Sequence, residues 1–227
     1  KVFPSYVRKS AVFSLFGMLL GMWGNQSRGS WLFNGLSGIL ITLRYCFVNI
    51  RYILVLLVAV VGIGYAFSSH QAYVARFEST FNISTDGSNL GRIYVWEADK
   101  QMIMDHPVTG VGPGLWGKKY AEQYQLKEET QNLGHSHNNL LQIASESGIL
   151  GLIGFLGFSF FIFCKSLIHY VKSRNPYDLS IMLGFISYLF LFGSIDYTWG
   201  NSSGIRIFWI VMGIMIQLKI NENHKVV

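Results

Sequence analysis

Long apolar runs constrain the fold of this chain more than any other feature of its sequence. A helix needs about 20 apolar residues to cross a lipid bilayer, and only 13% of the 227 residues are charged, against about 25% in ordinary soluble domains. The apolar segments lie at about residues 10–24, 31–43, 52–67, 140–164, 179–195 and 205–218. The sequence therefore predicts an all-α integral membrane protein, a helical bundle of about six spans, in which the two short first segments tilt or extend into flanking residues.

The basic residues predict how these spans are oriented. If the N-terminus lies in the cytoplasm, the inner segments carry ten basic and two acidic residues, and the outer segments carry eight basic and ten acidic residues. An excess of inner positive charge is usual in membrane proteins, so the net charge of +6 reports topology and indicates no nucleic-acid partner. We expect three parts: membrane helices in residues 1–67, a long, partly helical, outward-facing loop domain in residues 68–139, and three more membrane helices with a short cytoplasmic tail in residues 140–227.

The two cysteines and the first residue carry less information. Cys46 and Cys164 lie beside or within apolar runs, where packing is a more common role than a disulfide or a metal site. The chain begins at Lys1 with neither an initiator methionine nor a signal peptide. We therefore expect that membrane helices upstream of Lys1 are missing from it.

The polar region between the third and fourth apolar segments contains most of the candidate functional residues. Residues 92–104 predict a helix that stops before Pro107, because the residue before a proline disfavours helix. The glycines at residues 110–114 predict an irregular loop, residues 118–129 a second, solvated helix, and residues 79–90 a mobile loop. Glu97, Asp99 and Asp105 are expected to be solvated; the alternative is that one of them orients a histidine.

Three arginines are candidates for binding an anionic substrate. Arg28 lies on the outer side between two apolar segments, where it either binds phosphate or reaches to the membrane interface. Arg92 is expected at the start of the helix in the polar region, where free amides and the helix dipole attract anions; the alternative is a solvated surface arginine. Arg206, just inside the last apolar segment, is a secondary substrate-binding candidate, because a charge within a membrane is costly.

Two histidines are candidates for proton chemistry. His135 and His137 point the same way on an extended segment, but no third or fourth ligand has a convincing spacing, so no metal site is expected. Either histidine could act on a proton near neutral pH; the alternative is a buried structural role. Asn138 and Asn139 are expected to cap the following helix, and the aromatic-rich loop around Asp196 is expected to anchor the chain at the membrane interface.

Several of these residues form a pattern that resembles the O-antigen ligase and polymerase superfamily. The pattern consists of Ser-Arg-Gly at residues 27–29, Gly91-Arg92-x-x-x-Trp96, Pro-x-Thr-Gly-Val-Gly-Pro-Gly at residues 107–114, and His137-Asn138 followed by Gly148 and Gly151. Together these motifs cover residues 26–157, more than half of the chain. Each motif alone is weak, but their combination is specific.

The resemblance implies a membrane glycosyltransferase of the bacterial inner membrane, with an active site that faces the periplasm. Such enzymes move a glycan from a polyprenyl (undecaprenyl) diphosphate carrier to an acceptor hydroxyl with inversion, without a nucleotide sugar, metal or cofactor. Arg28 and Arg92 match the two arginines that would hold the diphosphate. His137 matches the histidine that would activate or orient the acceptor, and Asn138 is a further substrate-binding candidate. Family members usually have more spans than this chain, which thus resembles a C-terminal portion.

Ligation of O-antigen to lipid A–core is the first expectation for the reaction. A polymerase of O-antigen or capsule repeat units and a protein O-oligosaccharyltransferase stay open, because the pattern concerns the carrier rather than the acceptor. A polysaccharide transporter or flippase would need ionisable residues near the membrane midplane, and the apolar segments are nearly free of charge away from their ends. A sensor or scaffold would explain the polar region but not the arginines and histidine at the outer face.

Overall fold

The computed structural model of the chain describes residues 51–79, 81, 86–129, 133–174 and 176–223. The predicted spans at residues 10–24 and 31–43, together with Arg28, lie outside these residues. The described residues form helices, turns and loops and contain no strand, which agrees with the predicted all-α class. The chain divides into two compact units, Lys1–Asn82 and Ile83–Val227, and each is described by itself.

The first unit contributes two described helices. The helix α3 (Arg51–Ser68) has 18 residues and matches the apolar segment predicted at residues 52–67. The helix α4 (Gln71–Glu78) follows it closely. Large apolar side chains of α3 are exposed, among them Leu54, Val58 and Val61, as is typical of a surface that contacts lipid or protein.

The second unit begins with α5 (Gly87–Asp105), the helix predicted at residues 92–104. It starts earlier than predicted because Asp86 caps it, its side chain accepting a hydrogen bond from the Asn89 amide at 3.0 Å. The expected mobile loop at residues 79–90 is therefore wrong for residues 87–90. The helix ends at Asp105, and its C-cap residue His106 directly precedes Pro107, which agrees with the predicted stop before the proline.

The expected solvated helix at residues 118–129 is wrong in its bounds, and within that range Tyr120, Tyr124 and Glu129 are buried rather than solvated. The chain instead forms α6 (Trp116–Lys119) and a π-helical turn, η1 (Tyr120–Tyr124). Trp116 and Tyr120 stack with ring centroids 4.8 Å apart. Both are buried in an apolar core made with α5 and the following loop: Val95, Ala98, Met102, Val111, Trp116, Tyr120 and Tyr124.

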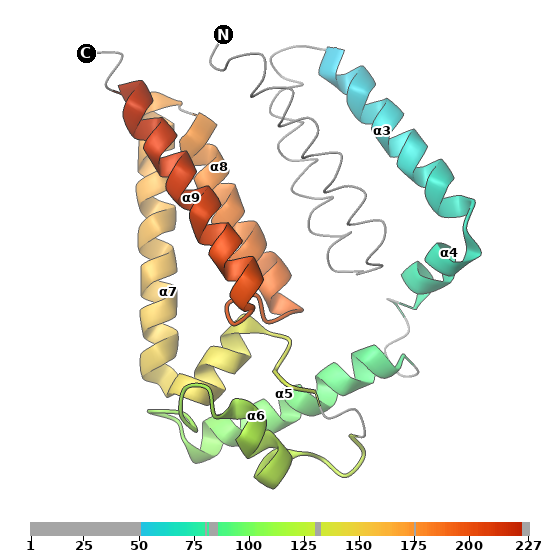
Figure 1. Ribbon diagram of the computed structural model, residues 1–227, viewed down its shortest axis with the longest axis vertical. Helices are drawn as coiled ribbons and strands as arrows, with labels where there is room; N and C mark the ends of the chain where they lie inside the picture. The colour runs from blue at the N-terminus through green and yellow to red at the C-terminus, as the bar shows by residue number, and fades with distance from the viewer. Residues whose placement is uncertain (1–50, 80, 82–85, 130–132, 175, 224–227) are drawn as a thin grey trace. The chain divides into compact units, whose positions relative to one another are not determined.

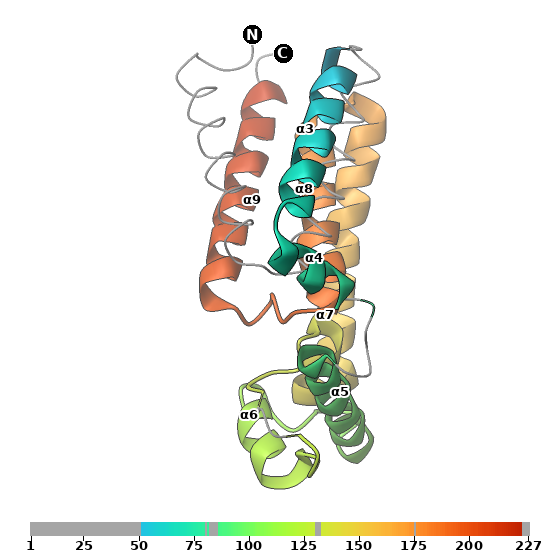
Figure 2. The same cartoon turned by 90° about the vertical axis from the view of Figure 1, so that its right-hand side faces the viewer.

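Three helices form the rest of the second unit and run side by side (Figures 1 and 2). They are α7 (Asn139–Ser173), α8 (Pro176–Phe185), which continues as η2 (Ile186–Leu191) and η3 (Phe192–Ser194), and α9 (Ser202–Asn223). Their shared core is Ile143, Phe155, Ile181, Phe185, Leu189, Phe208 and Met212. Within the described residues, one helix, over Asn139–Lys172, is long and apolar enough to cross a membrane, and two apolar helices are shorter, Ile181–Ser194 and Ser202–Ile214.

The helix α7 is broken at Gly148, and the glycine-rich loop after α5 docks onto this break. Gly148 has non-helical backbone angles, φ 62° and ψ −162°. Backbone hydrogen bonds run both ways between loop and helix: the amides of Val111 and Gly112 donate to the carbonyls of Ser145 (2.8 Å) and Glu146 (2.9 Å), and the Ile149 amide donates to the Pro107 carbonyl (2.9 Å). The loop and the break thus satisfy each other's free backbone groups.

Two glycines make this contact possible. A Cβ atom at Gly148 would overlap the Val108 backbone, and one at Gly110, whose φ is 67°, would overlap the backbone of Glu146 and Ser147. Both positions need a positive φ and a close backbone approach, which glycine alone provides without strain. Gly148 therefore breaks α7 at the point where the loop docks.

Gly148→Ala should lower the free energy of unfolding by about 2 kcal/mol, because alanine is strained at positive φ and its methyl group would push the loop away. Denaturant titration of the purified protein in detergent would measure this loss. Gly154→Ala is the matched control, since a Cβ there meets no described atom within 4 Å, and it should be neutral or slightly stabilising. Equal losses in the two variants would contradict the proposed lock between loop and helix.

Asp99 of α5 is fully buried, so the expectation that it is solvated is wrong. Its Oδ1 accepts a hydrogen bond from Trp116 Nε1 at 2.6 Å, and its relative exposure is 0%. Burial raises the pKa of Asp99 to about 6 and the charge of Glu146 acts in the same direction, whereas the neighbouring Ser136, Trp116 and Ser145 side chains act to lower it. The folded protein therefore binds this proton more tightly than the unfolded chain does.

The stability that Asp99 contributes should be present in full below pH 3.8 and be lost as the pH rises through about 6. Asp99→Asn cannot ionise, so between pH 5 and pH 8 the wild type should lose about 1 kcal/mol of unfolding free energy relative to this variant. Denaturant titrations at both pH values measure the difference. Glu97→Gln, which changes an exposed carboxyl group on the same helix, is the control. If the difference in unfolding free energy between the wild type and Asp99→Asn were the same at both pH values, the prediction would be contradicted.

Candidate functional site

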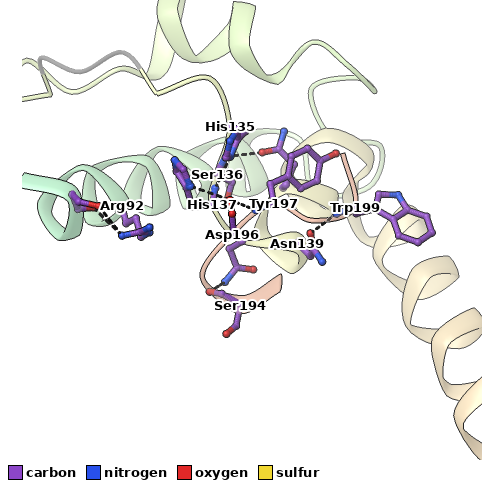
Figure 3. Close-up of polar contacts among 12 residues, drawn as sticks. Arg92, His135, Ser136, His137, Asn139, Ser194, Asp196, Tyr197 and Trp199 are labelled. Carbon is purple, nitrogen blue, oxygen red and sulfur yellow. Dashed lines mark hydrogen bonds and ion pairs between the residues drawn. The ribbon is translucent and has the colours of Figure 1, made fainter. Parts of the chain in front are cut away.

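The segment His135–Ser136–His137 leads directly into α7 and lies where α5, α7 and the loop after η3 meet (Figure 3). The backbone of Ser136 is held on both sides. Its amide donates to Gln142 Oε1 at 2.7 Å, and its carbonyl accepts from Trp96 Nε1 at 2.9 Å. Since Trp96 belongs to α5 and Gln142 to α7, this one residue connects the two helices.

Asn138 caps α7, as its sequence position predicts. Its Oδ1 accepts the amides of Leu140 (2.9 Å) and Leu141 (3.1 Å), which have no partner inside the helix. Its Nδ2 donates to the carbonyl of Ser194 at 3.1 Å. The side chain that was expected to bind substrate is therefore already engaged in positioning the helix and the end of η3.

Asn139 was expected to cap the helix together with Asn138, but it does not. It is the first residue of α7 and is fully buried. Its Nδ2 donates to the Leu189 carbonyl (2.8 Å) and to Thr198 Oγ1 (2.7 Å), and its Oδ1 accepts the Trp199 amide (3.0 Å). A Cβ at Gly193 would overlap this amide group. The polar atoms of this side chain thus fix both η2 and the loop at residues 195–201 against the start of α7.

This loop places Asp196 beside His137. The Asp196 Oδ1 lies 3.3 Å from His137 Nδ1 and also accepts the Tyr197 amide at 2.8 Å. Burial acts to raise the pKa of Asp196, but the hydrogen bonds from His137 and the Tyr197 backbone and the nearby histidine charges lower it overall. A carboxylate only accepts hydrogen bonds, so it directs the imidazole proton to Nδ1 and leaves Nε2 as a base.

Sequence reasoning missed Asp196, because the loop was interpreted as an aromatic anchor at the membrane interface. The available signal was its charge: Asp196 is the one acidic residue in the stretch from 179 to 221. A lone carboxylate between two apolar helices is costly unless it has a partner. The partner, His137, lies 59 positions earlier in the chain.

His135 lies against His137, with ring centroids 4.1 Å apart. Its Nδ1 accepts the His137 amide at 3.2 Å, and its ring centroid is 5.8 Å from that of Tyr197. Burial and the charges of His137 and Arg92 lower the pKa of His135, whereas the charge of Asp196 opposes the shift. His135 is therefore neutral at physiological pH.

Arg92 lies on α5, near enough to His135 for its charge to lower the pKa of that histidine (Figure 3). Its Nη1 donates to the carbonyl (3.3 Å) and to Oγ (3.0 Å) of Ser88, one turn earlier. The helix begins at Gly87, so the expectation that Arg92 stands at the helix start is wrong, and free helical amides do not add to its positive charge there. The guanidinium itself is the cationic group of the site.

The other two arginine candidates are not part of this cluster as described. Arg28 lies outside the described residues. Arg206 lies near the start of α9 and is exposed, and in the described part of the chain it forms no hydrogen bond or ion pair with His137 or Asp196. The structure thus brings together Arg92, His137 and Asn138 of the predicted residues and adds Asp196.

Folding supplies a third potential metal ligand that the sequence spacing did not indicate. His135, His137 and Asp196 each offer a ligand atom, and these atoms lie within 4.8 Å of one another. Two histidines and a carboxylate are a ligand set that suits zinc. The same groups are already joined by hydrogen bonds, an arrangement that suits proton transfer by His137 equally well.

Comparison with known proteins places the chain in a family. The model of the O-antigen ligase family matches residues 13–156, more than half of the chain. An uncharacterized protein of Haemophilus influenzae is 25% identical over 227 aligned residues, which cover 88% of this chain and 55% of that protein. A Rickettsia conorii protein that is provisionally named a polysaccharide ligase is 29% identical over 148 residues, which cover 60% of this chain and 34% of that protein.

The chain thus spans about half the length of one of these curated relatives, and the aligned part covers about a third of the other. The matched residues include the Gly-Arg motif of α5, the glycine-rich loop, the capping asparagine and the histidine beside Asp196. On the extent of this match, the chain belongs to the O-antigen ligase family.

Proposed function

We propose that this chain forms part of a membrane glycosyltransferase that moves a glycan from a polyprenyl diphosphate carrier to an acceptor hydroxyl. The observation that carries the proposal is the contact between His137 and Asp196 at 3.3 Å, beside the cation Arg92, in a chain of the O-antigen ligase family. A histidine oriented by a carboxylate is a general base, and an arginine is a ligand for phosphate.

The proposed setting is the bacterial inner membrane, with the site at its outer, periplasmic face. The support is α7, which is long and apolar enough to cross a membrane. It exposes Ile153, Phe160 and Phe161, residues that suit contact with lipid. The polar helices α5 and α6 lie at the end of the bundle where α7 begins (Figures 1 and 2), and the positive charge of the other loops predicts that this end faces outward. We further propose six spans in the whole chain.

The reaction proposed for this site is a direct displacement. The acceptor oxygen attacks the anomeric carbon while the bond from that carbon to the carrier diphosphate breaks, and the acceptor proton passes to Nε2 of His137. Negative charge develops on the departing diphosphate, where Arg92, together with Arg28, would stabilise it. One displacement inverts the anomeric carbon. Every step uses only the donor, the acceptor and these side chains.

We propose lipid A–core as the acceptor, which makes the enzyme an O-antigen ligase. The family description and the name of the Rickettsia conorii relative support ligation. Arg206, exposed near the start of α9, is proposed as a further contact for the anionic substrates. Polymerisation of repeat units on the carrier and transfer to a protein differ from ligation only in the acceptor, so product analysis separates them.

His137→Ala in the complete protein should lower glycan transfer by about 10²–10⁴-fold, because the acceptor hydroxyl loses its base. Asp196→Asn should lower transfer by up to about 10²-fold, since an amide no longer selects the tautomer with a free Nε2. Membrane vesicles supplied with carrier-linked glycan and lipid A–core, analysed by gel mobility, measure both effects.

His106→Ala, which removes an exposed histidine at the end of α5, is the control for this assay and should keep wild-type transfer. Near-normal transfer by His137→Ala would remove that residue from the mechanism. Longer carrier-linked chains with unmodified core would replace ligation with polymerisation. Movement of the carrier-linked glycan across the membrane without any transfer would favour a flippase.

Chelation of divalent metal with EDTA should leave the transfer rate unchanged, since the proposed steps need no metal. Added Zn²⁺ should inhibit, because His135, His137 and Asp196 can bind it and the metal would then replace the hydrogen bond by which Asp196 orients the His137 imidazole. Transfer assays with EDTA, and with EDTA followed by excess Zn²⁺, measure these effects. A rate that falls with EDTA and returns with metal would instead make the three residues a catalytic metal site.

A further inference from the structure

The backbone of His137 is in an unusual conformation. Its φ is 51°, and among the described residues only His137 and Arg174 have a positive φ without being glycine. Such a conformation costs about 1–2 kcal/mol. Arg174 ends a helix, where a left-handed residue is common, but His137 precedes one. Strain of this kind persists where surrounding contacts hold it, and it is frequent at functional sites.

The neighbours of His137 are fixed independently of its own backbone. Ser136 is held by Gln142 and Trp96, and Asn138 by its capping bonds and by Ser194. These contacts anchor both ends of the turn, and the bond from Trp96 Nε1 to the Ser136 carbonyl also holds one edge of the peptide plane between Ser136 and His137. The other edge of that plane, the His137 amide, donates one hydrogen bond, to Nδ1 of His135 at 3.2 Å.

This bond has the geometry of an Asx turn, in which a side-chain acceptor at residue i receives the amide of residue i+2. The Nδ1 atom of histidine and the Oδ1 atom of asparagine are both bonded to Cγ, so they reach the same amide. The Nδ1 atom accepts only when its proton is absent, which requires neutral His135 with its proton on Nε2. The groups around it, His137, Arg92 and Asp196, together with burial, favour the neutral ring.

We propose that His135 is a positioning residue for His137: by accepting the His137 amide, it holds the left-handed turn that brings the His137 ring to Asp196. This inference rests on the proposed function, because it assigns a second residue to the same base. The His135 ring also lies against the His137 ring, at 4.1 Å between centroids and an angle of 54°. Substitutions of His135 can therefore remove its hydrogen bond to the His137 amide and its ring contact with His137 separately.

Three variants of the complete protein separate the two contributions. His135→Asn keeps the acceptor and removes the ring. His135→Phe keeps a ring and removes the acceptor. His135→Ala removes both, and His106→Ala serves as the control at an exposed histidine. Each is first compared with wild type in thermal unfolding, so that a loss of transfer is not confused with a loss of folding.

In the vesicle transfer assay, His135→Ala and His135→Phe should each lower kcat by about 10–10²-fold, because a displaced base misses the acceptor proton. The KM for the carrier-linked donor should stay unchanged, since Arg92 is untouched. His135→Asn should restore most of the wild-type kcat. Equal losses in His135→Asn and His135→Ala would overturn the proposal, as would wild-type rates in His135→Phe.

Hydrogen exchange followed by mass spectrometry tests the turn without any assay of activity. In peptides that cover residues 133–141, one slowly exchanging amide should become fast in His135→Ala and His135→Phe and stay protected in His135→Asn. Unchanged protection in His135→Ala would overturn the proposal even if transfer fell. If wild-type protein showed no transfer to any acceptor, the proposed function would fail, and the exchange experiment would still decide whether His135 holds the turn.

Discussion

Two adjacent asparagine side chains, Asn138 and Asn139, join the start of α7 to the loop after η3, and the geometry of the site depends on this junction. Asn138 satisfies the free amides of α7 and reaches the Ser194 carbonyl. Asn139 donates to Leu189 and Thr198 and accepts from Trp199. Because buried amide groups are costly to leave unpaired, the loop has one stable position, and that position sets Asp196 against His137.

Features of the site that depend on local signals were predictable from the sequence. The end of α5 before Pro107 follows from the restriction that proline places on the preceding residue, and the cap at Asn138 follows from a short polar side chain ahead of an apolar helix. The motifs that resembled the family also lie within the matched residues. Each of these features is encoded within a few neighbouring positions.

Features that depend on contacts between distant segments were not predictable. The pairing of Asp196 with His137 spans 59 positions, and the burial of Asp99 depends on Trp116, 17 positions later. Gly148 lies in an apolar, helical sequence, and its positive φ becomes visible only when the loop at Val108 packs against it. Hydrophobic periodicity predicts where the helices lie, but it does not predict which distant residue contacts Asp196, Asp99 or Gly148.

The spacing of Arg92 and Trp96 along α5 explains how the separation between Arg92 and His137, the proposed cation and base, is fixed. Residues four positions apart lie on one face of a helix, so the face of α5 that carries Arg92 also carries the indole that donates to the Ser136 carbonyl. Ser136 precedes His137 directly, and thus one hydrogen bond of 2.9 Å links the helix that carries Arg92 to the segment that carries His137. A substrate whose diphosphate lies at Arg92 would then present its anomeric carbon at a separation from His137 that α5 itself determines.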